Sequence, residues 1–134
     1  MTAQFLAVGV GCRSGVAAEV IVDLVEAALA RTARADLAVA LFTVVDKSSE
    51  PGIAEAAGRL GLTLVHLPRV ALETVADRVA TRSQKVIELF GVPSIAEGSA
   101  LAGAGAAGRL LFPRIADRGA TVAVAISGED GGTP

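Results

Sequence analysis

The sequence predicts an α/β fold with three layers, α/β/α, in which a mostly parallel sheet of about five strands ends in an antiparallel C-terminal strand. Apolar runs of strand length alternate along the chain with segments whose apolar residues recur at helical spacing. Hydrophobic residues make up 52% of the 134 positions and charged residues 19%, enough to bury the core of one domain. We find no repeat and no linker, and therefore expect a single domain over residues 1–127 and a flexible tail over residues 128–134.

The first part of the chain predicts a strand, a helix and a second strand. Residues 3–10 are a short apolar run that ends in glycine, which is typical of a buried strand. Residues 16–31 carry apolar side chains on one helical face and acidic ones on the other, and we expect Ser14 to be the N-cap of that helix. Residues 37–45, LAVALFTVV, predict a second buried strand.

A second helix and a third strand follow. Pro51 in the first turn and Gly61 just past the last turn bracket a helix over residues 52–60. Residues 62–67, LTLVHL, predict the third strand, and Pro68 ends it.

The last part of the chain predicts two helices and then two strands. Ser83 is the expected N-cap of the first helix, and Ser94 and Glu97 form the S-x-x-E pattern of a capping box at the start of the second. The two strands are joined by a short link, so we expect them to pair antiparallel. The ranges are residues 84–90 and 94–105 for the helices, and 109–113 and 121–127 for the strands.

Composition excludes several classes of function. The chain has four Phe, no Trp, no Tyr and a net charge of −2, which disfavours a nucleic-acid-binding surface. A single cysteine and a single histidine disfavour a disulfide framework and a metal site, and we expect no cofactor. No segment resembles a signal peptide or a membrane span, so a cytoplasmic protein with no membrane partner is expected.

A glycine-rich turn, residues 9–15, follows the first strand with the sequence GVGCRSG. It misses the dinucleotide pattern G-x-G-x-x-G because the third glycine comes one position late, and no P-loop lysine follows. Glycines nevertheless allow a ligand to approach the backbone, and ligands of open α/β sheets bind beyond the carboxyl ends of the strands. The turn therefore predicts an anion or carboxylate site, with a plain strand-to-helix turn as the alternative.

Cys12 lies inside this turn and admits two interpretations. The start of a helix can lower a thiol pKa, and a thiolate is a nucleophile. Catalysis by a thiolate usually needs a base, and the one candidate is His66 at the end of the third strand. The alternative is a small, partly buried residue, which is the commoner use of a lone cysteine.

Other charged residues also follow strand ends. The loop DKSSEPG, residues 46–52, contains Asp46 and Lys47 and should lie at the same sheet edge as the glycine-rich turn. Its alternative is a solvated loop. For Ser83 and Lys85 the alternative is an N-cap with solvated charges. The charges of residues 109–118 are most simply those of a solvated hairpin. The capping box already gives Glu97 a structural role.

The chain contains, in this order, the segments VGVGCRSG, DKSSEPG, SQKVIELFGVPSIAEGSAL and TVAVAI. Together these segments resemble the CobE/CbiG C-terminal domain family of cobalamin (vitamin B12) biosynthesis. Ile95 stands where the family pattern has Val, and Gly98 where it usually has Ala. The resemblance covers nearly the whole chain.

The resemblance implies a role in assembly of the corrin ring. CbiG of the anaerobic route is associated with opening the δ-lactone of a cobalt-precorrin and loss of a two-carbon fragment as acetaldehyde. Its relatives carry an additional N-terminal portion. Because this chain starts directly at the first strand, we expect the stand-alone form of the aerobic route.

The resemblance also implies the ligand, because precorrins are tetrapyrroles with many acetate and propionate carboxylates. We expect a protein that binds a precorrin intermediate as a carrier or accessory factor, in contact with other corrin-pathway enzymes. The alternatives are an enzyme acting on a precorrin lactone, as a hydrolase or in ring contraction, with Cys12 or Glu97 in the chemistry, or a subunit that assists a pathway methyltransferase. The expected substrate-binding residues are Gly9, Gly11, Cys12, Arg13, Ser14, Gly15, Asp46, Lys47, Ser83, Ser94 and Glu97.

Overall fold

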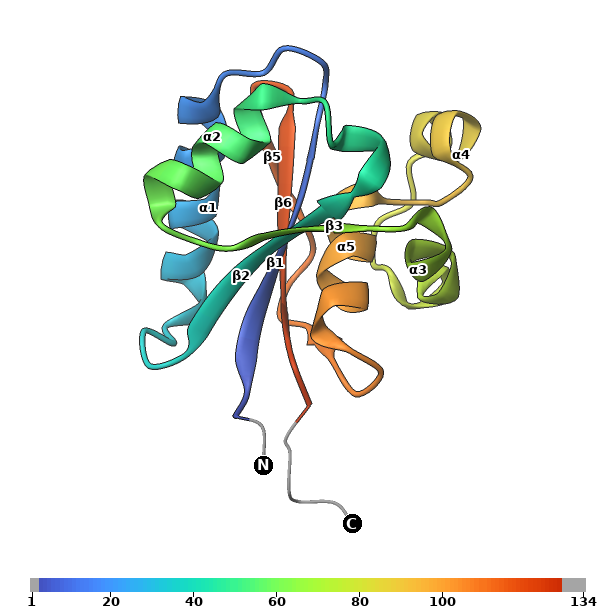
Figure 1. Ribbon diagram of the computed structural model, residues 1–134. Helices are drawn as coiled ribbons and strands as arrows, with labels where there is room; N and C mark the ends of the chain where they lie inside the picture. The colour runs from blue at the N-terminus through green and yellow to red at the C-terminus, as the bar shows by residue number, and fades with distance from the viewer. Residues whose placement is uncertain (1–2, 129–134) are drawn as a thin grey trace.

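The computed structural model describes residues 3–128 and contains one six-stranded sheet (Figure 1). Five of its strands lie in the order β3-β2-β1-β6-β4, and β5 pairs with β6. The strands are β1 (Phe5–Cys12), β2 (Ala38–Val44), β3 (Leu64–Leu67), β4 (Arg109–Leu110), β5 (Ile115–Asp117) and β6 (Ala120–Ile126).

The direction of the strands confirms the predicted fold. Strands β1, β2 and β3 pair parallel, whereas β6 pairs antiparallel with β1, β4 and β5. Among the strands of residues 3–128, β6 is thus the one that runs against the other five. The predicted mostly parallel sheet with an antiparallel C-terminal strand is therefore confirmed, with six strands where about five were expected.

Helices cover both faces of the sheet (Figure 1). Helices α1 (Ala18–Thr32) and α2 (Pro51–Leu60) pack on one face, and α5 (Ile95–Ala104) packs on the other with α3 (Arg69–Thr74) beyond it. Helix α4 (Gln84–Phe90) precedes α5, and the short 3-10 turns η1 (Val45–Lys47) and η2 (Ala76–Arg78) lie between elements. As predicted, Pro51 begins α2 and Gly61 ends it in the left-handed conformation (φ 68°).

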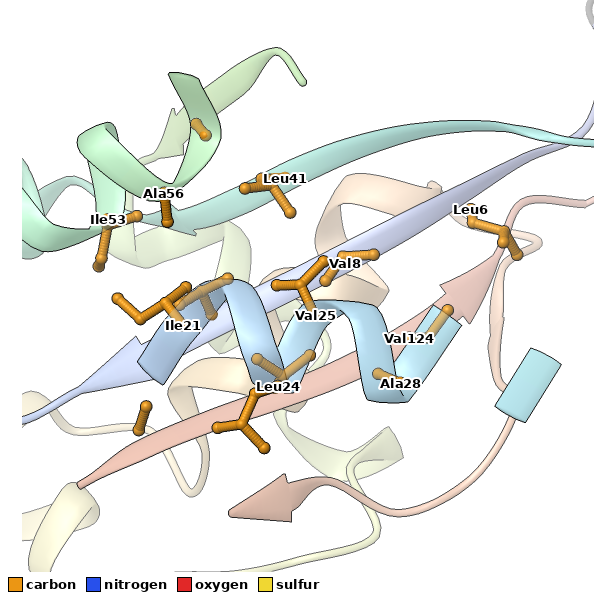
Figure 2. Close-up of a cluster of buried hydrophobic side chains, with 14 of the residues drawn as sticks. Leu6, Val8, Ile21, Leu24, Val25, Ala28, Leu41, Ile53, Ala56 and Val124 are labelled. Carbon is orange, nitrogen blue, oxygen red and sulfur yellow. The ribbon is translucent and has the colours of Figure 1, made fainter. Parts of the chain in front are cut away.

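The larger core lies between the sheet and α1 with α2 (Figure 2). Val8 of β1 and Leu41 of β2 meet Ile21 and Val25 of α1 there, all with no exposed surface. These side chains are aliphatic because the chain has few aromatic residues, so many small contacts replace a few large ones. This packing holds the carboxyl ends of β1 and β2 in place.

The other face depends on very close packing of α5 against β1. A Cβ atom at Gly9 would overlap the backbone carbonyl oxygen of Ala96 in α5. Gly9 is therefore needed for the close approach of α5 to β1, and its ligand role stays a prediction. Six of the nine buried residues in the second core cluster are alanines, including Ala7, Ala96 and Ala100, which permits this close approach.

Two local predictions were wrong. Helix α1 begins at Ala18, and its N-cap position is Ala17, so Ser14 is not the N-cap. Gly15 takes a left-handed conformation (φ 80°) and donates its N–H to the Glu50 carboxylate (3.1 Å), which keeps the chain out of the helix there. The expected strand 109–113 stops at Leu110, and β5 forms inside the expected link instead, because Pro113 has no N–H to donate to the ladder.

Part of the sequence prediction lies outside the described residues. Of the expected tail, residues 129–134 are not described, so the domain boundary at residue 127 stays a prediction. Within residues 3–128, none of the helices taken singly has the length and hydropathy to cross a membrane. Helices α4 and α5 meet that criterion only as a pair bent by 69°.

Candidate ligand cavity at the sheet edge

A cavity of about 790 Å³ lies at the edge of the sheet where β1 ends and β6 begins. The pairing of Cys12 with Ala120 brings the glycine-rich turn and the β5–β6 turn side by side. Loop residue Lys47 and the segment from Ser83 to Ile95 complete the walls. Its volume is within the range of small-molecule sites, which is roughly 300–1,000 Å³.

The structure brings most of the expected site residues to this cavity. Seven of them line it, namely Gly11, Cys12, Arg13, Ser14, Lys47, Ser83 and Ser94. The other four, Gly9, Gly15, Asp46 and Glu97, are absent from its lining. Asp46 pairs with Arg69, Gly15 shapes the turn, and Glu97 is fully buried behind the wall.

Basic side chains dominate the charged groups of the cavity. Arg13 and Lys47 were expected, and three further cations that the sequence left as solvated charges, Lys85, Arg114 and Arg118, also line it. Asp117 is the one acidic residue of the lining, and it pairs with Arg118 (2.8 Å). Within residues 3–128, none of the other four cations has a carboxylate within salt-bridge distance. The cavity is therefore electropositive although the chain is acidic overall.

One wall of the cavity is apolar. Val86, Leu89 and Phe90 of α4 contribute to it, together with Pro93 and Ile95. The Lys47 ammonium lies 5.2 Å from the centre of the Phe90 ring, a cation–π contact that joins the charged and apolar walls. A ligand that fits this cavity would combine negative charge with apolar surface.

Two serines offer hydroxyl groups at the cavity. Ser83 caps α4 by accepting a hydrogen bond from the Val86 N–H (3.3 Å), and Ser94 caps α5 by accepting from the Glu97 N–H (3.1 Å). Both N-cap predictions are thus confirmed. In each case the hydroxyl oxygen accepts, so its proton stays available for a ligand acceptor.

Glu97 forms only half of the predicted capping box. Its carboxylate accepts hydrogen bonds from the Thr81 N–H (2.7 Å), the Thr81 hydroxyl (3.0 Å) and the Arg114 N–H (2.8 Å). These three bonds tie the segment before α4 and the segment before β5 to α5. Glu97 therefore fixes the backbone of two cavity walls from behind, and its carboxylate does not face the cavity.

Cys12 is half-buried in the cavity wall. Burial raises the pKa of its thiol, and the nearby Glu50 carboxylate raises that pKa too, while the Lys47 charge lowers it. His66, the one candidate base, lies exposed on β3 and does not line the cavity. The thiol is therefore protonated at neutral pH and lacks a histidine base, which is the setting of a packing residue.

Alkylation of Cys12 by iodoacetamide provides a test. The pH midpoint of the alkylation rate is expected to lie above that of free cysteine, because burial disfavours the thiolate. Lys47→Ala is expected to move the midpoint further up, and Glu50→Ala to move it down. Mass spectrometry of the modified protein over a pH series measures it, and a midpoint below that of free cysteine would contradict this assignment.

Sequence comparisons identify relatives that cover most of the chain. The family described as cobalamin synthesis G C-terminus matches residues 6–125. Protein CobE of Sinorhizobium sp. is 34% identical over 121 residues, which are 90% of this chain and 79% of that protein.

Two crystal structures are similar to this chain. The structure of CobE, a protein from the cobalamin (vitamin B12) biosynthetic pathway, has a TM-score of 0.87 at 30% identity and covers 95% of this chain and 93% of its own. The structure of cobalamin biosynthesis protein chiG from Agrobacterium tumefaciens str. C58 has a TM-score of 0.72 at 38% identity, over 92% of this chain and 99% of its own.

Proposed function

The chain belongs to the family of the cobalamin synthesis G C-terminus and is a cobalamin biosynthesis protein, and on that premise we propose that its cavity binds a precorrin-type tetrapyrrole. In this proposal the protein is a carrier or accessory factor of the aerobic route. Cytoplasmic location and contact with other enzymes of the pathway stay predictions from the sequence.

The observation that carries the proposal is the charge of the cavity. Arg13, Lys47, Lys85 and Arg114 line it, and within the described part of the chain no carboxylate forms a salt bridge with any of them. Precorrins carry acetate and propionate side chains around a ring, so they present several carboxylates at the periphery and an apolar surface over the ring. Guanidinium and ammonium groups can bind the carboxylates, and the apolar cavity wall to which α4 contributes can contact the ring.

The arrangement supports binding more than catalysis. Neither catalytic candidate is placed for chemistry, since the Cys12 thiol is held protonated and the Glu97 carboxylate accepts three hydrogen bonds. The remaining charged groups of the cavity are basic side chains and the paired Asp117. Such a set holds carboxylates in place without offering a general base for opening a lactone.

Titration with a tetrapyrrole that bears acetate and propionate groups tests the proposal. Purified protein is mixed with uroporphyrin, and visible absorbance is followed to saturation, with co-elution on gel filtration as a second readout. We expect a saturable spectral change with equimolar binding that weakens as salt is added. An unchanged spectrum together with separate elution would overturn the proposal.

A further inference from the structure

Helix α4 differs from the other α-helices in how little of it is buried. It spans Gln84–Phe90, and none of its residues is buried, whereas α5 directly after it is buried along most of its length. Figure 1 shows α4 standing away from the sheet, beyond α5. Gly91, in the left-handed conformation (φ 75°), ends α4 and separates it from α5. Most of the α4 surface is thus not buried by packing against the core.

Two stripes of side chains run along α4, and only one of them has a packing role. Val86 and Phe90, four residues apart, pack against the small cluster that contains Leu72 and Val92. Lys85 and Leu89, also four residues apart, form the neighbouring stripe and line the cavity.

Leu89 has no structural use in the described part of the chain. It is 61% exposed and belongs to none of the three hydrophobic clusters that residues 3–128 form. Scattered exposed leucines are common, but this one lies on a cavity wall, one helical turn from a lysine. An apolar side chain and a cation about 6 Å apart along a helix match a ligand in which a carboxylate sits close to an apolar ring.

We propose that α4 selects the ligand of the cavity through this pair, Leu89 covering the face of a tetrapyrrole ring while Lys85 binds a carboxylate on one of its short side chains. The inference rests on the proposed function and adds a specificity-determining element to it. Arg13 and Arg114 line the cavity with α4 and would take further carboxylates of the same ligand. Two contacts of different kinds would distinguish a ring that carries carboxylates from a carboxylate without a ring.

Two variants and two matched controls test the role of α4. Leu89→Ala and Lys85→Ala remove one contact each. Val70→Ala on α3 is the control for the first, because Val70 is also 61% exposed and lies outside the cavity lining. Arg59→Ala on α2 is the control for the second, since Arg59 is exposed and pairs only with Glu55 among the described residues. Because Leu89 and Lys85 are exposed, all four proteins are expected to fold, and thermal melts verify it.

Titration with uroporphyrin, and with citrate as a carboxylate without a ring, separates the outcomes. Leu89→Ala is expected to weaken uroporphyrin binding about tenfold and to leave citrate competition unchanged, because citrate has no ring to cover. Lys85→Ala is expected to weaken both and to flatten the salt dependence. If Leu89→Ala and Val70→Ala bind uroporphyrin equally well, the role of α4 is overturned while the proposed function stands. If the unmodified protein binds no uroporphyrin, both are overturned.

Discussion

Replacing Glu97 by alanine is expected to lower the free energy of unfolding by about 3–5 kcal/mol, because it removes a buried carboxylate that accepts three hydrogen bonds. The N–H groups of Thr81 and Arg114 would lose their acceptor, and the removed side chain would leave a void against α5. Urea denaturation followed by circular dichroism measures the change.

Two variants serve as controls for that experiment. Glu97→Gln keeps the shape and one acceptor oxygen but turns an NH₂ group toward a donor, so we expect a smaller loss, about 1–3 kcal/mol. Glu55→Ala removes an exposed carboxylate of α2 that pairs with Arg59 and is expected to cost under about 0.5 kcal/mol. A loss for Glu97→Ala no greater than that for Glu55→Ala would show that the three hydrogen bonds do not hold the walls together.

Reversing two charges of the cavity is expected to weaken tetrapyrrole binding by a factor of about 100 or more. Arg13 and Lys47 both line the cavity, and each would change from attracting a ligand carboxylate to repelling it in Arg13→Glu, Lys47→Glu. Neither residue takes part in a salt bridge within residues 3–128, so the double variant should unfold within about 1 kcal/mol of the unmodified protein.

The matched control for the charge reversal is Arg59→Glu, which changes net charge by half as much on an exposed face of α2, outside the cavity lining. Its affinity for uroporphyrin should remain within about threefold of that of the unmodified protein at physiological salt, because Arg59 is exposed and outside the cavity lining, where salt screens its charge. Equal losses in the control and in the double variant would point to a general charge effect and against a site.

The fold was predictable because its main signals are local. Strands β1 and β2 are each marked by a continuous apolar run. Helix α2 is marked by a proline at its start and a glycine just past its end, Pro51 and Gly61. The error at Ser14 arose because a distant partner decides the outcome there. Ser14 has the right chemistry for an N-cap, but Gly15 is held by Glu50, which is 35 positions away.

The site was predictable to the extent that parallel strands share an edge. That rule alone places Arg13 and Lys47 at the same end of the sheet, because each follows the carboxyl end of a parallel strand. Arg114 and Arg118 were left as solvated charges because their position depends on the antiparallel register of β6, which pairs Ala120 with Cys12. The expected antiparallel strand was itself the available signal, since such a strand starts at the edge where its parallel neighbours end.

Glu97 illustrates the limit of a local motif. The S-x-x-E spacing correctly indicates the cap formed by Ser94. It says nothing of Thr81 or Arg114, which lie 16 and 17 positions away along the chain and donate their N–H groups to the Glu97 carboxylate. Glu97 is the single charged residue on a helix of otherwise small or apolar residues, and this is the hint in the sequence that its carboxylate has partners elsewhere.

The central claim is that a carboxylate-rich tetrapyrrole binds at this cavity, and mapping backbone amide chemical shifts by NMR during a uroporphyrin titration tests it most directly. We expect saturable shifts in residues 11–14, 83–95 and 114–121, which are weakened in Arg13→Glu, Lys47→Glu, while residues of α2 and β3 stay unchanged. Shifts centred on α2 or β3, or no shifts at all at saturating ligand, would contradict it.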